Sequence, residues 1–181
     1  EKMLDERIQK DTVEEDEIRR VAVVLAEFFR KASPEPMAPH EYVARFKRWI
    51  REDRDVLRNP IFQLPTDLVE GGVAPLLRVV RKCPSLLERR AGRLIEGHGD
   101  LRPEHVCLET KPVIFDCLEF NREFRMVDPV DELAFLSMEC DRLGATFVEP
   151  LLLGVYESIT GDRPDERLVR FYKARRACLR A

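Results

Sequence analysis

Two histidines and an aspartate lie close together in one turn-rich stretch of the sequence. His98, Asp100 and His105 belong to the segment GHGDLRPEH at positions 97–105, just before a short β-prone run. Loops held by a rigid scaffold often carry reactive side chains. A further carboxylate, Asp116, ends the next β-prone run. Because a carboxylate is disfavoured after three apolar strand residues unless it has a purpose, Asp100 and Asp116 are the first candidates for chemistry.

Two carboxylates with different tasks are what phosphoryl transfer requires. One carboxylate orients the attacking hydroxyl and accepts its proton, while the other holds the Mg²⁺ that neutralises charge on the phosphates. A hairpin between the two runs would bring its outer ends together. We therefore predict that Asp100 and Asp116 share one site.

The elements that must position this site are mostly helical. The runs 106–108 and 113–115 are β-prone and predict a small two-stranded hairpin, because they are joined by the turn-prone sequence ETKP. Elsewhere, apolar residues recur at three- and four-residue steps. That spacing predicts helices over about 14–32, 42–57, 65–95, 129–143, 146–160 and 165–179, the third interrupted at Gly71-Gly72 and at Pro84. The expected fold class is mostly α with a small β hairpin.

Length and composition suit one soluble domain over residues 1–181. The net charge of −3 does not favour nucleic acid or an anionic membrane surface as a partner. The longest apolar runs are too short for a membrane span. Five scattered cysteines without a CxxC pair fit free thiols in a reducing compartment, so a cytoplasmic location is expected.

The motif segments together resemble a known family. His98-Gly99-Asp100, then VIFD at 113–116, then LEFN at 118–121 and DPVDELAFL at 128–136, are similar to the aminoglycoside phosphotransferases and related kinase-like enzymes. The match covers about residues 94–145. It implies the C-terminal, helical lobe of a protein-kinase-like fold, with ATP and Mg²⁺ as cofactors and a hydroxyl-bearing small molecule as substrate.

The resemblance also implies roles for individual residues. Asp100 would position the substrate hydroxyl, and Asp116 would bind magnesium. Asp128 would brace the catalytic loop as a structural residue, and His98 would buttress the same loop.

Two features depart from the family pattern. His105 stands where the family has an asparagine as second metal ligand, and imidazole is a poor ligand for a hard cation. His105 is therefore expected either to contribute to the cofactor and metal site or to hydrogen-bond Asp100 or Asp116. The family's N-terminal nucleotide-binding lobe is absent from residues 1–181, so this chain alone is expected to be inactive or nearly so.

Two other functions stay open at this level. His98, Asp100, His105 and Asp116 would be the direct ligands of a transition metal in a metal-dependent phosphoester hydrolase. The other alternative is a non-catalytic, pseudokinase-like interaction module.

The charge around the motif has two interpretations. Between Glu96 and Glu132 there are ten acidic and four basic side chains. They would form either a negative pocket for a cationic or polyhydroxylated substrate or a solvated surface. Of the basic residues there, Arg102, Arg122 and Arg125 are weaker candidates for contacts with phosphate.

Overall fold

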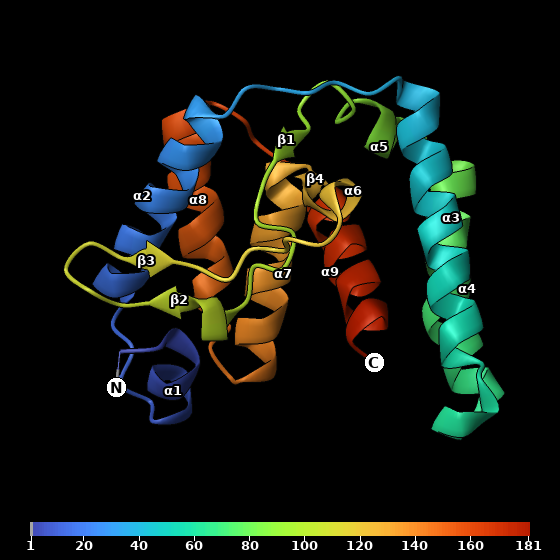
Figure 1. Ribbon diagram of the computed structural model, residues 1–181, viewed down its shortest axis with the longest axis horizontal. Helices are drawn as coiled ribbons and strands as arrows, with labels where there is room; N and C mark the ends of the chain where they lie inside the picture. Colours follow the sequence, from blue (N-terminus) through green and yellow to red (C-terminus); the bar gives the residue numbers. More distant parts are fainter. Residues whose placement is uncertain (1) are drawn as a thin grey trace.

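The computed structural model describes residues 2–181, in which helices dominate and strands form two short pairs (Figure 1). The α-helices are α1 (Leu4–Gln9), α2 (Glu15–Lys31), α3 (Pro39–Leu57), α4 (Thr66–Lys82), α5 (Ser85–Glu88), α6 (Arg122–Arg125), α7 (Pro129–Arg142), α8 (Val148–Thr160) and α9 (Glu166–Arg180). The strands are β1 (Ile95–Glu96), β2 (Val106–Cys107), β3 (Val113–Ile114) and β4 (Met126–Val127), and the 3₁₀ turns are η1 (Pro60–Phe62) and η2 (Pro103–His105).

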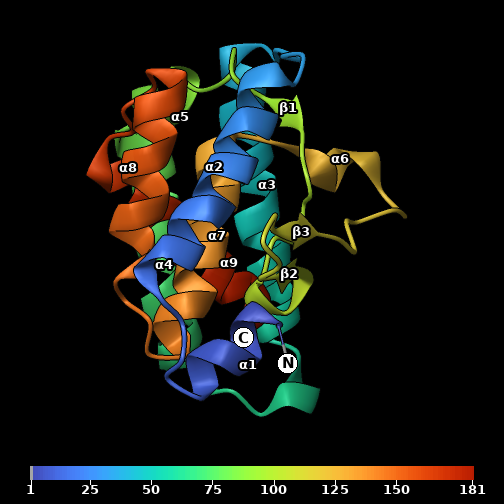
Figure 2. The ribbon, with the colours of Figure 1, turned by 90° about the vertical axis from the view of Figure 1, so that its left-hand side faces the viewer.

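Helix α7 runs through the centre of the molecule and is almost wholly buried. It packs against α8 and α9, while α2 lies along α8 and α3 lies along α4 (Figure 1). Figure 2 shows that β1, β2, β3 and α6 lie on one side of the α2, α7 and α8 helices. The strands therefore form a thin layer on a helical body, and the predicted fold class is confirmed.

The two strand pairs frame the segment that carries the motif. Strand β2 pairs antiparallel with β3, with Val106 opposite Ile114, as the hairpin prediction requires. Strand β1 pairs antiparallel with β4, with Ile95 opposite Val127. The chain between β1 and β2 is therefore tied at both ends, and it contains residues 97–105.

Side-chain caps define the starts of the helices that follow the motif. Asn121, Asp128 and Asp165 accept hydrogen bonds from the backbone N–H groups of Glu123, Val130 and Arg167 at the starts of α6, α7 and α9. Helix α8 ends at Gly161, whose φ of 71° lies in the left-handed region that favours glycine.

The predicted break at Gly71-Gly72 is wrong. Helix α4 continues through both glycines and through Pro75. A Cβ on Gly72 would lie 3.5 Å from the Cys178 sulfur of α9, an ordinary van der Waals distance, and the helix buries Val69, Val73, Leu76 and Val80. Tertiary packing thus outweighs the low helix propensity of glycine.

Within residues 2–181 no helix combines the length and the apolar character needed to cross a bilayer. The five cysteines, all described, are free thiols. The cytoplasmic location stays a prediction.

Candidate active site

The segment between β1 and β2 begins with two glycines that tolerate no side chain. Gly99 has a φ of 82°, and a Cβ there would lie 2.9 Å from the Phe124 carbonyl oxygen. A Cβ on Gly97 would lie 2.7 Å from the Glu132 carboxylate. The G-H-G sequence therefore allows the chain to pass closely between α6 and α7.

His98 connects the two aspartates through the backbone. Its Nε2 donates to the Phe115 carbonyl oxygen at 2.7 Å, one residue before Asp116. The backbone N–H of Asp100 donates to His98 Nδ1 at 3.3 Å. The ring is buried, so one side chain fixes the backbone at both carboxylates, consistent with the expected buttressing role.

The ring of His105 lies between the side chains of Asp100 and Asp116. Its Nδ1 donates to the Asp100 carbonyl oxygen at 2.9 Å and lies 3.9 Å from Asp100 Oδ2. Its Nε2 lies 3.3 Å from Asp116 Oδ2. The structure therefore places both carboxylates near one imidazole, and the hydrogen bond that His105 forms with Asp100 goes to the backbone carbonyl of that residue.

The two carboxylates differ in their surroundings. The Asp100 side chain is 32% exposed and accepts a hydrogen bond from Arg102 Nε at 3.0 Å. The Asp116 side chain is 73% exposed. Asp116 has a φ of 60°, a left-handed conformation that aspartate tolerates better than most residues. Asp100 is thus held by a cation, while Asp116 faces solvent at a strained turn.

Helix α7 braces the loop through Glu132. The Glu132 carboxylate accepts hydrogen bonds from the backbone N–H groups of His98 at 2.9 Å and Gly99 at 2.5 Å. Burial raises the pKa of Glu132, and the two N–H groups oppose that rise. Arg176 of α9 adds a hydrogen bond to the Gly99 carbonyl oxygen at 3.0 Å while forming a bidentate ion pair with Asp131.

Asp128 lies one helical turn before Glu132, and its hydrogen-bond partners lie outside the loop of residues 97–105. Besides capping α7, its carboxylate forms a bidentate pair with Arg90 and accepts from the Tyr172 hydroxyl at 2.9 Å. The structural interpretation of Asp128 agrees with these contacts. The direct braces of the loop are Glu132 and Arg176, which the sequence analysis did not single out.

Replacing Glu132 with Gln is expected to loosen the loop locally. A glutamine offers one acceptor oxygen, so its NH₂ group would face one of the two backbone N–H groups. An unsatisfied buried donor costs about 1–3 kcal/mol. A local loss of about 1–3 kcal/mol should make amide hydrogen exchange at His98 or Gly99 about 5- to 150-fold faster. NMR can measure this exchange rate residue by residue.

Glu139 provides the matched control for this experiment. It is buried on the same helix but pairs with the more exposed Arg142 and Arg180, so Glu139→Gln should leave exchange at the loop unchanged. Unchanged protection at both His98 and Gly99 in Glu132→Gln would contradict the bracing role.

The residues around the site offer few ligands for a resident metal. Within residues 2–181 there is no group of three His, Cys, Asp or Glu side chains arranged to hold a metal ion. The ring nitrogens of His105 already contact the Asp100 carbonyl oxygen and, at 3.2 Å, the Arg102 guanidinium. This arrangement does not favour the hydrolase alternative, which needs His98, Asp100, His105 and Asp116 as joint ligands.

Most of the acidic side chains near the motif are neutralised by nearby cations. Carboxylates of this region form ion pairs as follows: Glu96 with Arg122 and Arg125, Asp100 and Glu104 with Arg102, Glu109 with Lys2, Glu123 with Arg48, Asp128 with Arg90, and Asp131 with Arg176. The excess of acidic residues between Glu96 and Glu132 therefore does not form a cluster of unpaired carboxylates in the structure. The same pairs occupy Arg102, Arg122 and Arg125.

Comparisons with known proteins agree with this architecture at the level of the fold. No protein-family model matches the chain. Uncharacterized proteins from Mycobacterium tuberculosis and Mycobacterium bovis are 37% identical over 93 residues, which is 51% of this chain and 19% of each relative. The matched segment thus spans about a fifth of the length of those relatives.

A solved structure gives the broader match. The structure of a glucosamine kinase superposes with a TM-score of 0.62 at 13% sequence identity, over 96% of this chain and 48% of its own. At that identity the likeness concerns the fold alone. This chain therefore has the fold of the helical half of a kinase-like protein.

Proposed function

We propose that this chain is the helical, carboxylate-bearing lobe of an ATP-dependent phosphotransferase that acts on a hydroxyl of a small molecule. The observation that carries the proposal is the convergence of Asp100 and Asp116 on the two ring nitrogens of His105. The kinase-like fold of the structural neighbour supports the same broad class of activity.

Asp100 is the residue that would receive the proton of the attacking hydroxyl. Its carbonyl is fixed by His105 and its N–H by His98, so its side chain has a defined starting point. Asp100 also lines a pocket of about 330 Å³, from which a hydroxyl can approach. In phosphoryl transfer, catalysis consists almost entirely of such positioning and of electrostatic stabilisation.

Asp116 is the residue that would hold magnesium. Mg²⁺ is usually bound by one or two carboxylates together with substrate phosphates and waters, so a single exposed carboxylate fits this ion. Bound there, magnesium would neutralise charge on the phosphates. We assign His105 a positioning role between the two aspartates, because its hydrogen bonds already occupy the ring and imidazole suits softer metals.

In the proposed function, the nucleotide is bound by a second lobe together with this helical lobe. The superposition covers less than half of the glucosamine kinase chain. We propose that a nucleotide-binding lobe comes from sequence outside residues 1–181 and that residues 1–181 alone turn over little or no ATP. An aminoglycoside is one candidate substrate through the resemblance.

Nucleotide protection of the whole protein tests the assignment of Asp116. With Mg·ATP at about 100 times Kd, linkage predicts about 2.7 kcal/mol of stabilisation, visible as a rise of several degrees in Tm. Asp116→Asn should abolish most of the magnesium-dependent part of this rise. Asparagine keeps the ability to adopt a left-handed φ, so the variant should fold normally.

Asp100→Asn is the control for this measurement, because Asp100 is assigned to the hydroxyl and not to the metal. It should retain the magnesium-dependent protection. Equal protection of the wild type and Asp116→Asn would refute the metal assignment. A whole protein that shows no protection by Mg·ATP would favour the non-catalytic interaction module.

A further inference from the structure

The pocket beside Asp100 combines aromatic walls with a buried cation. It has a volume of about 330 Å³, and its lining includes Trp49, Asp100, Phe120, Phe124 and Arg175. Helices α3 and α9 contribute Trp49 and Arg175, α6 contributes Phe124, and the chain just before α6 contributes Phe120. In Figure 1, α6 and α9 lie between the central helix α7 and the α3/α4 pair.

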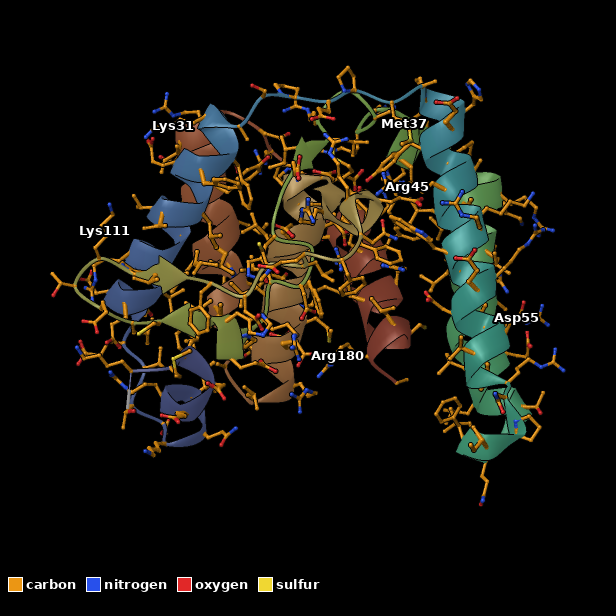
Figure 3. All side chains as sticks on the ribbon, viewed as in Figure 1. Lys31, Met37, Arg45, Asp55, Lys111 and Arg180 are labelled. Carbon is orange, nitrogen blue, oxygen red and sulfur yellow. The ribbon has the colours of Figure 1, made fainter. Side chains whose placement is uncertain are left out.

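Two guanidinium groups flank Trp49. Arg45 lies 4.2 Å and Arg175 lies 4.9 Å from the centre of a Trp49 ring. Arg45, labelled in Figure 3, extends from α3 towards the centre, where it donates to the backbone carbonyls of Glu123 and Met126. Both arginines are at least 95% buried, so each charge has been removed from water.

Neither of these arginines is fully satisfied by its neighbours in the described part of the chain. Arg45 Nε and Nη1 and Arg175 Nε are buried without a hydrogen-bond partner. Asp53 Oδ2 lies 3.4 Å from Arg175 Nε, yet neither atom forms a hydrogen bond. Of the two arginines, only Arg175 lines the pocket. Buried polar groups are nearly always paired, so its unbonded Nε points to room for a further acceptor there.

Arg176, in contrast to Arg175, has a hydrogen-bond partner for every nitrogen of its guanidinium group. It is the next residue along α9 and equally buried, but Asp131 and the Gly99 carbonyl oxygen occupy its three nitrogen atoms. Burial lowers the pKa of Arg175, and the charge of Arg176 lowers it further. Asp53 and Asp131 oppose this fall, but Asp53 Oδ2 forms no hydrogen bond with Arg175, so the Arg175 guanidinium can pair with a further anion.

We infer that the substrate is an anionic hydroxyl compound, whose carboxylate or phosphate group pairs with Arg175 while its hydroxyl lies against Asp100. The face of a sugar or other ring would pack on Trp49, Phe120 and Phe124. This inference rests on the proposed function, because it takes Asp100 as the residue that receives the hydroxyl. It disfavours a polycationic aminoglycoside, which would bring amines next to an underpaired guanidinium.

Three pyranoses that differ mainly in charge test the inference without nucleotide. Glucuronate, glucose and glucosamine carry similar hydroxyl groups with charges of −1, 0 and +1 near neutral pH. In equilibrium binding to the whole protein by calorimetry, glucuronate should bind at least tenfold more tightly than glucosamine. Arg175→Gln should remove this preference, and Arg175→Lys should keep part of it.

Arg78→Gln is the matched control, because Arg78 lines a second basic groove of about 540 Å³ with Lys47, Arg51 and Arg81. This groove lies between α3 and α4 and does not include Asp100. The control should retain the full preference for glucuronate. A preference lost in Arg78→Gln and retained in Arg175→Gln would overturn the inference, as would equal binding of the three sugars, tighter binding of glucosamine, or no binding of glucuronate.

These outcomes are independent of the test of the proposed function. Charge preference is measured without ATP, whereas the metal assignment is measured by nucleotide protection. Selective binding of glucuronate without any Mg·ATP protection would support an anion-binding pocket and count against the phosphotransferase. Mg·ATP protection with a preference for glucosamine would do the reverse.

Discussion

Asp100→Asn is expected to reduce kcat for phosphoryl transfer in the whole protein by about 10²- to 10⁴-fold, the usual effect of removing a positioned proton acceptor. Asparagine preserves the shape of the side chain but cannot accept the hydroxyl proton. The KM for ATP should change little, because Asp116 and the phosphates remain as they are. Steady-state kinetics with saturating Mg·ATP and a phosphorylatable hydroxyl compound would measure both constants.

Glu104→Gln is the matched control for this substitution. Glu104 and Asp100 both accept hydrogen bonds from Arg102, and their side chains are 35% and 32% exposed. If the loss arose only from disturbing Arg102, both variants would be impaired alike. The proposed role requires a large loss in Asp100→Asn and a small one in Glu104→Gln, and similar kcat values for the two variants would contradict it.

The helical body could be predicted from the sequence because its signals are local. The apolar spacing around Ile18, Tyr42 and Leu168 reflects residues that are buried in the structure, and the hairpin forms where ETKP joins two β-prone runs. The β1/β4 pair was not predicted. Each of its strands has only two residues, and Glu96 lies thirty positions before its partner Met126. Local periodicity therefore cannot indicate this pairing.

The two aspartates could be predicted for a different reason. They lie in one hairpin-linked segment, so their convergence follows from short-range geometry and from the resemblance over residues 94–145. The residues that hold the loop could not be identified in this way. Arg176 lies 77 positions from Gly99 in sequence, and only the tertiary fold brings it there.

One signal for the buried arginines was nevertheless present. Arg175 and Arg176 follow Leu168, Phe171 and Tyr172 at helical spacing, so the pattern places two cations on the inward face of α9. Charged residues are rarely buried without partners. Two arginines on the inward face of a predicted helix therefore indicate a buried ion pair or a ligand contact.

Arg90→Met is expected to cause a large loss of stability. Arg90 is buried and makes bidentate ion pairs with both Asp128, which is 0% exposed, and Asp162, which is 5% exposed. Burial pushes the pKa of Asp162 up, but hydrogen bonds from Arg90 and Tyr156 outweigh it and hold the pKa below its ordinary value. Removing one partner of a buried pair costs about 3–5 kcal/mol, because the remaining charge is left uncompensated.

Denaturant unfolding of Arg90→Met at neutral pH would measure this loss, with Arg93→Ala as control. Arg93 also approaches Asp162, at 3.4 Å, but its side chain is 52% exposed, so its removal should cost less than about 1 kcal/mol. Combining Arg90→Met with Asp128→Asn and Asp162→Asn should recover part of the loss, since asparagine at position 128 can still cap α7. The loss in free energy of unfolding caused by Arg90→Met should also become smaller at acid pH, because the carboxyl groups that lost their partner take up protons there. A loss that is the same at acid and neutral pH, and that the asparagines do not reduce, would mean that the packing of the Arg90 side chain matters and its charge does not.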